Sequence, residues 1–421
     1  MKWGRIVRRN STQLLLGLEA TDSWGVVDSA RPASAVYDSG VISRVPGLAL
    51  HRRRALSSLL ALALGLLLAA GLLEIGAWVI RPEASYERWH ASSLRYLLDS
   101  EVDWKLEPGP HPWGRINGDH FRGPPLSKDK PADVFRIAVL GGSAAFDLYK
   151  SDEQAWPLLL EQRLNSDSPA ARKVPRYQML NAGTPGYSTW QSVRLLRARI
   201  FDWHPDLILV YHLYNDSLAF RFDDSEKIIR GWRINARANH LSVAAHAHPA
   251  WDALGRVLPH AGDLLRHQWI QFQRRQRLQE NAVYWHRPKL GERAHPVGLG
   301  FYRDNLEHMA ELCEAHGVRM GIITQASMIR EHPTAEQRQV IGYGYRGLSH
   351  PELWASYERA WQMATELAER HEHVFASPVH LWVPPTREMF HDEVHLTDRG
   401  SALLSELLAR HLQEDILEAP P

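Results

Sequence analysis

The sequence predicts an α/β protein with a three-layer α/β/α arrangement around a doubly wound parallel sheet, an apolar N-terminal helix and a helical insertion. Two observations predict this class. Short apolar runs typical of buried strands alternate along the chain with segments of helical periodicity. Polar residues suited to catalysis directly follow two of these strands, and parallel sheets of this kind bind ligands beyond the carboxyl ends of their strands.

Five segments open the alternation before residue 217. The expected strands are apolar runs such as VFRIAVL, which leads into a Gly-Gly-Ser sequence, and PDLILVY. Runs of this length that end at turn residues are typical of strands buried on both faces. The expected order is strand 134–140, helix 156–164, strand 177–180, helix 188–201 and strand 205–211.

The alternation stops at residue 217 and resumes after residue 299. Residues 217–299 are rich in Arg, His, Trp and Gln and contain a helical stretch at 265–278. We expect them to form an insertion that caps the sheet and determines substrate preference. The segments 134–216 and 300–421 then form one domain, which continues as helix 302–316, strand 318–324, helix 351–371, strand 373–376 and helix 398–414.

Residues 55–80 form an apolar segment, ALSSLLALALGLLLAAGLLEIGAWVI, with Glu74 as its one charge. About 20 helical residues cross the hydrocarbon core of a bilayer, so this segment predicts a transmembrane helix. Arg52–Arg54 precede it, and flanking positive charge keeps that side in the cytoplasm, which places the larger C-terminal part outside the cytoplasm. A cleaved signal peptide is the alternative; its apolar region would be shorter, and no convincing small-x-small cleavage site precedes Glu74. We therefore expect an uncleaved single-pass anchor in the cell membrane.

Two further segments flank this anchor. Residues 1–54 are polar and lack a sustained period, so we expect a disordered cytoplasmic tail; a translation start near Val45 is the alternative. Residues 81–133 combine many Pro and Gly residues with several Trp residues, as in EPGPHPWGRINGDHFRGPP. Linkers seldom carry so many aromatic residues, so we expect an ordered but irregular lead-in that covers the domain.

Composition excludes several classes of protein. The net charge is +1, from 49 basic and 48 acidic side chains, and no nucleic-acid-binding motif is present, so no nucleic-acid partner is expected. Cys313 is the one cysteine, which rules out an intramolecular disulfide and a cysteine metal cluster. The pairs His246/His248 and His371/His373 lack acidic residues at ligand spacing, so we expect surface histidines, no metal and no cofactor.

Ser143 is the candidate nucleophile. It follows Gly141 and Gly142 at the end of an expected strand, and glycines permit a tight turn into a helix whose free N–H groups can face an oxyanion. A mononucleotide loop would require Gly-Lys-Ser/Thr, and a dinucleotide fingerprint would require a third glycine. Neither is present in this segment.

His395 is the candidate base, and Asp392 lies three residues before it. A carboxylate at this spacing can hold one imidazole nitrogen and leave the other to face Ser143. Gly186 can bring a backbone N–H close to a substrate, and the Asn215 amide can donate a second hydrogen bond to an oxyanion. As alternatives, each of these segments could be a simple turn or helix cap, although Asp398 already suits capping of the last helix.

Together these residues resemble the SGNH/GDSL hydrolase superfamily over residues 134–412. Gly142 and Leu213-Tyr214 stand where more familiar members carry Asp and Gly. The resembling segments are Gly141-Gly142-Ser143, Asn181 to Ser188 (NAGTPGYS), Tyr214-Asn215-Asp216 and Asp392-x-x-His395.

The resemblance implies a flavodoxin-like fold and hydrolysis of esters through an acyl-enzyme. Ser143, His395 and Asp392 would be the catalytic triad, and Ser143, Gly186 and Asn215 would form the oxyanion hole. From the expected location, the substrate would carry O-acyl esters of envelope or exported polysaccharide, with a lipid ester as the other choice. Trp190 and Trp382 could stack on sugars. An O-acyltransferase with the same triad and a non-catalytic envelope or assembly protein remain as alternatives.

Overall fold

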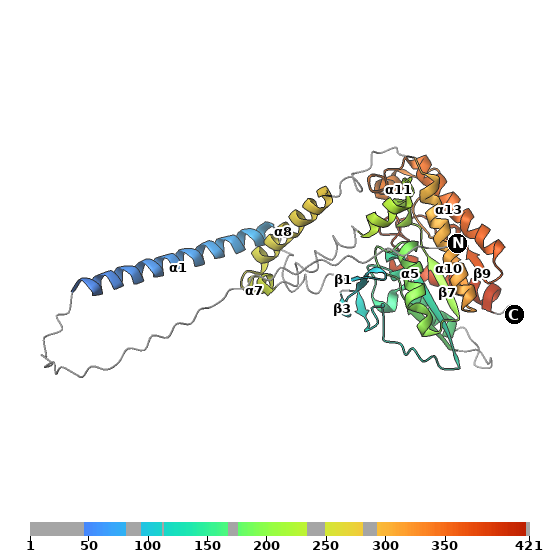
Figure 1. Ribbon diagram of the computed structural model, residues 1–421, viewed down its shortest axis with the longest axis horizontal. Helices are drawn as coiled ribbons and strands as arrows, with labels where there is room; N and C mark the ends of the chain where they lie inside the picture. Colours follow the sequence, from blue (N-terminus) through green and yellow to red (C-terminus); the bar gives the residue numbers. More distant parts are fainter. Residues whose placement is uncertain are drawn as a thin grey trace, which may run out of the picture. The chain divides into compact units, whose positions relative to one another are not determined.

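A parallel sheet of five strands forms the centre of the domain (Figure 1). The computed structural model describes residues 46–80, 94–111, 113–166, 176–233, 249–280 and 293–417. The strands lie in the order β6-β5-β7-β8-β9, and each neighbouring pair is parallel. This order, in which the second strand lies outside the first and the remaining strands follow on the other side, is the flavodoxin-like doubly wound order and confirms the predicted fold class. The strands are β5 (Val134–Gly141), β6 (Arg176–Asn181), β7 (Leu207–Tyr211), β8 (Arg319–Ile323) and β9 (Val374–Ser377).

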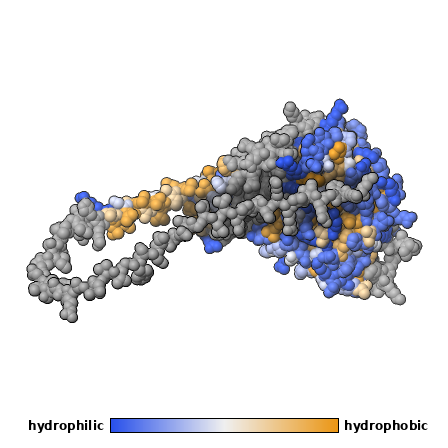
Figure 2. Space-filling view, viewed as in Figure 1, coloured by the Kyte–Doolittle hydropathy of each residue, from blue (hydrophilic) through white to orange (hydrophobic). Residues whose placement is uncertain are grey.

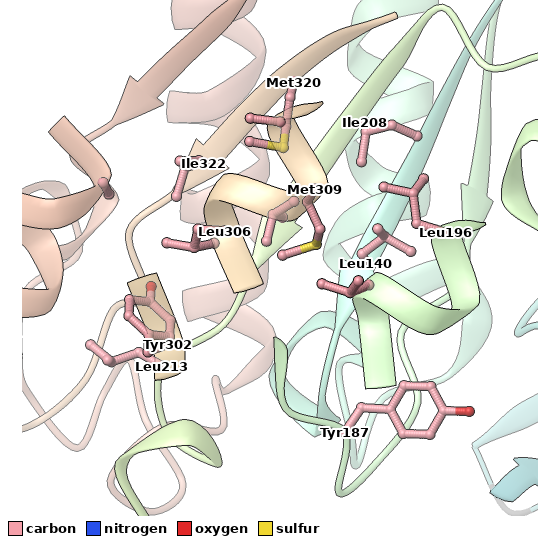
Figure 3. Packing of buried hydrophobic residues seen from close by; sticks show 14 of the residues in the cluster. Leu140, Tyr187, Leu196, Ile208, Leu213, Tyr302, Leu306, Met309, Met320 and Ile322 are labelled. Carbon is pink, nitrogen blue, oxygen red and sulfur yellow. The ribbon is translucent and has the colours of Figure 1, made fainter. Parts of the chain in front are cut away.

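Helices cover both faces of the sheet. Alternate residues of β5 point to opposite sides, so Ala138 and Leu140 join one buried cluster while Ile137 and Val139 join another. The first cluster includes side chains of α5 (Thr189–Ala198), α10 (Pro296–Ala315) and α13 (His350–Arg370), and part of it is seen in Figure 3. The second includes side chains of α4 (Trp156–Ser166) and α15 (Asp398–His411). The three predicted layers are therefore present.

The predicted alternation of strands and helices is confirmed, with differences at the ends of elements. The expected helix 188–201 ends at Ala198 and is followed by the 3-10 turn η2 (Ile200–Trp203). The last expected helix begins at Asp398, but Thr397 is its N-cap, because its side chain accepts a hydrogen bond from the backbone N–H of Gly400 at 3.1 Å.

The lead-in segment is more regular than the sequence predicts. It forms two antiparallel hairpins, β1 (Tyr96–Asp99) with β2 (Asp103–Leu106) and β3 (Gly109–His111) with β4 (Gly114–Ile116). Trp104 of β2 donates its indole N–H to the carbonyl of Pro185 at 3.3 Å. The hairpins therefore pack on the loop that carries Gly186.

The N-terminal helix α1 (Pro46–Ile80) includes the expected transmembrane segment. Residues Arg54–Ile80 have a mean hydropathy of 2.4 and none of their apolar window is buried, so this helix is long and apolar enough to cross a membrane. Figure 2 shows the apolar surface along it. The predicted disordered tail is wrong for residues 46–54, which are helical, and residues 1–45 lie outside the described part. The chain divides inside α1 into two units, Met1–Leu64 and Gly65–Pro421.

The insertion contains a helix at 225–233 and helices α7 (Pro249–Val257) and α8 (Pro259–Glu280), which confirms the helix expected at 265–278. One face of its first helix is buried, with Ile228 and Trp232 packed against Phe301 of α10. The first turn of α8 is capped by Glu74 of α1, whose carboxylate accepts from the backbone N–H groups of His260 and Ala261, both at 2.8 Å.

Candidate active site

Ser143 lies at the carboxyl end of β5, an inner strand of the sheet, as the first residue of the short helix α3 (Ser143–Phe146). The chain approaches its neighbours closely just before it. A Cβ atom on Gly142 would lie 2.5 Å from Asn215 Nδ2 and 2.9 Å from the carbonyl oxygen of Tyr187. Only a glycine fits between these groups without displacing them, so Gly142 permits the contact between the nucleophile turn and Asn215.

The three predicted triad residues meet at this point. His395 Nε2 lies 2.7 Å from Ser143 Oγ, and His395 Nδ1 lies 2.7 Å from Asp392 Oδ2. The other carboxylate oxygen of Asp392 accepts from the backbone N–H groups of Val394 at 3.0 Å and His395 at 2.9 Å. These bonds fix the carboxylate, which in turn fixes the imidazole with Nε2 toward the serine.

The electrostatics of Asp392 suit this role. Partial burial acts to raise the pKa of its carboxyl group, but the hydrogen bond from His395, the charge of that ring and two backbone N–H groups lower the pKa to about 2. Asp392 is therefore ionised at neutral pH and can stabilise a positively charged imidazole.

The expected oxyanion donors lie around the same turn. Asn215 Nδ2 donates to the carbonyl of Tyr187 at 2.7 Å, which uses one of its two amide hydrogens. Gly186 has φ of +87°, in the region that favours glycine. Among the described residues, no hydrogen bond uses the backbone N–H of Ser143 or of Gly186. Two backbone donors and one amide hydrogen are thus available to a negatively charged oxygen.

We expect Asn215→Ala to lower kcat for ester hydrolysis about 10²- to 10³-fold with a small change in KM, because the lost donor acts mainly on the transition state. Steady-state kinetics on p-nitrophenyl acetate measure this effect. Asn165→Ala on α4 is the control, since its amide donates to the backbone of Glu161 and Tyr177. A loss of the same size in both variants, or a change in KM alone, would contradict the role of Asn215.

Arg122 supports the turn that follows Ser143, although no sequence pattern indicates this role. Its buried guanidinium donates to the carbonyl oxygens of Phe146 at 2.6 Å, Asp147 at 2.8 Å and Lys150 at 2.5 Å. It also forms an ion pair with Asp152 at 2.9 Å. Arg122 therefore ties the segment that follows Ser143 to the lead-in.

The aromatic residues beside the triad are not those expected. Trp190 packs against Phe301, with 5.8 Å between ring centroids, and Trp382 packs against His411 at 5.2 Å. Tyr149 instead lies against His395, with ring centroids 5.5 Å apart.

Tyr149 is 47% exposed and has φ of +72°, a backbone conformation that is uncommon for a bulky residue. The Tyr149 ring also contacts Trp113 of the lead-in, again with ring centroids 5.5 Å apart. The two rings form an aromatic wall next to the nucleophile.

Asp216, the residue that follows Asn215, carries a buried carboxyl group. Asp216 accepts hydrogen bonds from the backbone N–H of Thr189 at 3.0 Å and from its hydroxyl at 2.5 Å. Burial raises the pKa of Asp216 from 3.8 to about 7. The nearby His212 accepts or donates a 2.7 Å hydrogen bond with Ser192, and burial lowers its pKa to about 3.

This carboxyl group should make stability depend on pH. The folded state binds the Asp216 proton more tightly than the unfolded state does, so the free energy of unfolding falls as the pH rises from the ordinary pKa toward about 7. Asp216→Asn keeps a neutral acceptor for Thr189. We expect it to match the wild type near pH 4, where the carboxyl group is largely protonated in both states, and to be more stable by about 2–4 kcal/mol at pH 8.

Urea unfolding at both pH values measures this difference. The exposed Asp129 supplies the control variant, Asp129→Asn, which should change stability little at either pH. A stability difference between Asp216→Asn and the wild type that stays constant with pH would contradict the prediction.

Comparison with known proteins gives structural similarity alone. No family model matches the chain, and no curated protein matches it. Similar solved structures include an acetyl xylan esterase, AlAXEase (9% identity, 66% of this chain and 100% of that chain, TM-score 0.38), and the esterase EstA from Pseudoalteromonas sp. (12%, 66% and 97%, 0.35). A GDSL-like lipase from Bacteroides thetaiotaomicron VPI-5482 is also similar (11%, 69% and 92%, 0.34). Since these TM-scores are below 0.5, we take the fold from the sheet topology and the chemistry from the side-chain geometry.

Proposed function

We propose that this chain is a serine ester hydrolase of the SGNH/GDSL type. The observation that carries the proposal is the continuous hydrogen-bonded chain from Ser143 Oγ through the His395 ring to Asp392, with both distances at 2.7 Å. The position of Ser143 at the carboxyl end of the inner strand β5 and the available donors of Gly186 and Asn215 support it.

The mechanism follows from this geometry. Ser143 Oγ attacks the ester carbonyl carbon while His395 Nε2 takes the hydroxyl proton, and Asp392 stabilises the resulting imidazolium. The N–H groups of Ser143 and Gly186 and the Asn215 amide hold the carbonyl oxygen as it becomes negative. His395 then protonates the leaving alcohol oxygen, and an acyl group remains on Ser143. Water attacks this acyl-enzyme with His395 again as base, which releases the acid and restores the serine.

The substrate that we propose is a carbohydrate that carries an O-acyl ester. The aromatic wall of Tyr149 and Trp113 supports this choice, because flat aromatic rings next to a nucleophile offer an apolar surface to the C–H face of a sugar. Its polar surroundings, with the exposed His391 ring 6.1 Å from Tyr149, suit a hydroxyl-rich ligand better than a long acyl chain.

The proposed location is outside the cytoplasm, on a single membrane anchor. Its support is the apolar stretch Arg54–Ile80 of α1 and the preceding Arg52–Arg54, which favour a cytoplasmic N-terminus. At this location the ester would belong to an envelope or exported polysaccharide. Protease accessibility of the C-terminal part in spheroplasts tests the orientation, and protection of that part until lysis would contradict it.

A fluorophosphonate probe tests the nucleophile directly. We expect the full chain to be labelled once, at Ser143, and to hydrolyse p-nitrophenyl acetate. Ser143→Ala should lose both properties, and Ser151→Ala, whose hydroxyl donates to Gln154, should keep them. Absence of both labelling and hydrolysis in the folded wild type would refute the proposal and favour a non-catalytic binding protein. If labelling occurs but acyl groups pass to added sugar faster than to water, the chain is an O-acyltransferase.

A further inference from the structure

A cluster of two histidines and a glutamate lies where α10, α13 and β9 meet. Glu314 belongs to the last turn of α10, His371 is the residue that ends α13, and His373 directly precedes β9. One ligand atom from each of the three lies within 4.8 Å of the others. Both imidazoles are half-buried and Glu314 is exposed, so the ring positions are held by packing while the carboxylate can rotate.

This arrangement corrects the expectation from the sequence. His371 and His373 have no acidic residue at ligand spacing along the chain, but the fold brings two glutamates of α10 beside them. Glu307 Oε1 lies 2.6 Å from His371 Nε2, and Glu314 faces both rings within the cluster. The acidic partners come from a helix that is distant in sequence.

The second nitrogen of each ring already has an acceptor. His371 Nε2 faces the Glu307 carboxylate at 2.6 Å, and His373 Nε2 faces the carbonyl oxygen of Ala310 at 2.9 Å. When both Nε2 atoms carry the proton, both Nδ1 atoms carry a lone pair. Metal-binding histidines commonly donate their other N–H to a carboxylate or a backbone carbonyl, which fixes the tautomer and the ring orientation.

Glu307 is itself held in place. Its other carboxylate oxygen lies 2.6 Å from an Arg370 nitrogen, so the carboxylate is anchored between Arg370 and His371. The cluster thus has ligands and a supporting layer of hydrogen bonds. An ion pair between Glu307 and His371 does not by itself explain why His373 and Glu314 also lie beside His371.

We propose that Glu314, His371 and His373 bind one Zn²⁺ ion, with water at the remaining position. Two imidazoles and one carboxylate are a common donor set for zinc, whereas Ca²⁺ and Mg²⁺ prefer oxygen ligands throughout. The ion would join the end of α10, the end of α13 and the start of β9. It would therefore act as a structural clamp.

The site is separate from the ester-cleaving site. His373 precedes β9 and so lies at the amino edge of the sheet, whereas Ser143 follows the carboxyl end of β5. In a parallel sheet these are opposite edges. Removal of the ion should lower thermal stability and leave hydrolysis of p-nitrophenyl acetate unchanged below the melting temperature.

Zinc titration of the detergent-solubilised full chain, freed of any affinity tag and stripped with a chelator, tests the proposal. We expect one Zn²⁺ per chain by isothermal titration calorimetry and a higher melting temperature with zinc. His371→Ala and Glu314→Ala should lose this binding. Glu307→Gln should weaken it about 10- to 100-fold, because Glu307 only orients a ligand. His332→Ala, whose side chain is 90% exposed, is the control and should bind as the wild type does.

Two outcomes would overturn the proposal. One is a wild type that binds no stoichiometric zinc. The other is binding that persists unchanged in both His371→Ala and Glu314→Ala. Glu314→Ala removes an exposed side chain, so it keeps the test valid even if the histidine variant fails to fold.

Discussion

Replacing Ser143 by alanine is expected to lower kcat for p-nitrophenyl acetate by at least about 10⁴-fold while KM changes little. The variant loses the atom that forms the acyl-enzyme, and its oxyanion donors alone give only residual rate enhancement. His395→Ala should cost a similar factor, because the base acts only through the serine. The double variant should be no slower than either single variant, since residues of one triad act as a unit.

Steady-state kinetics of the three variants, with circular dichroism as the control for folding, measure this prediction. Ser143→Ala removes only one hydrogen bond of Oγ, worth about 1 kcal/mol, so the melting temperature should stay within a few degrees of the wild-type value. If the two single losses multiply in the double variant, Ser143 and His395 act independently, and the triad assignment is wrong.

Local patterns were enough to predict the sheet. Helices cover both faces of the strands β5 and β7, so these strands are short, mostly apolar runs. Such runs can be recognised directly in the sequence. Ser143 and Asn215 are predicted as site residues because each follows such a strand, where the geometry of a parallel sheet brings them to one edge. Asp392 and His395 are predicted as a pair because they are three residues apart, and the structure places their side chains within hydrogen-bonding distance.

The residues that the sequence did not reveal act through distant partners. Arg122 donates to backbone carbonyl groups of the turn after Ser143. Every residue type has a backbone carbonyl, so the residues of the turn do not indicate this contact. The glutamates beside His371 lie on a different helix, so chain spacing could not show them. The start of α1 differs from the expectation for a local reason: the irregular tail expected over residues 1–54 includes Pro46-Gly47, although proline is well suited to the first turn of a helix.

A buried ion pair joins the catalytic loop to the rest of the domain. Arg346 Nη1 lies 3.0 Å from Glu393 Oε2, and the two side chains are 0% and 5% exposed. Glu393 stands between Asp392 and His395, and its backbone carbonyl accepts from the N–H of Met328 at 2.8 Å. The Arg346 guanidinium also donates to Ser217, at 2.6 Å, two residues after Asn215. The pair thus links the loop that carries His395 to the segment that follows Asn215.

Glu393→Ala is expected to lower the free energy of unfolding by about 3–5 kcal/mol, because it leaves the Arg346 charge buried without its partner. It should also lower kcat, since the loop that positions His395 loses an anchor. Replacing both residues, as Arg346→Met with Glu393→Leu, should cost less stability than the single variant, because no unpaired charge remains. Urea unfolding and kinetics on the same three proteins separate the two effects. A double variant that regains stability but not kcat would show that the pair positions the catalytic loop, whereas a Glu393→Ala variant with wild-type stability would contradict the buried pair.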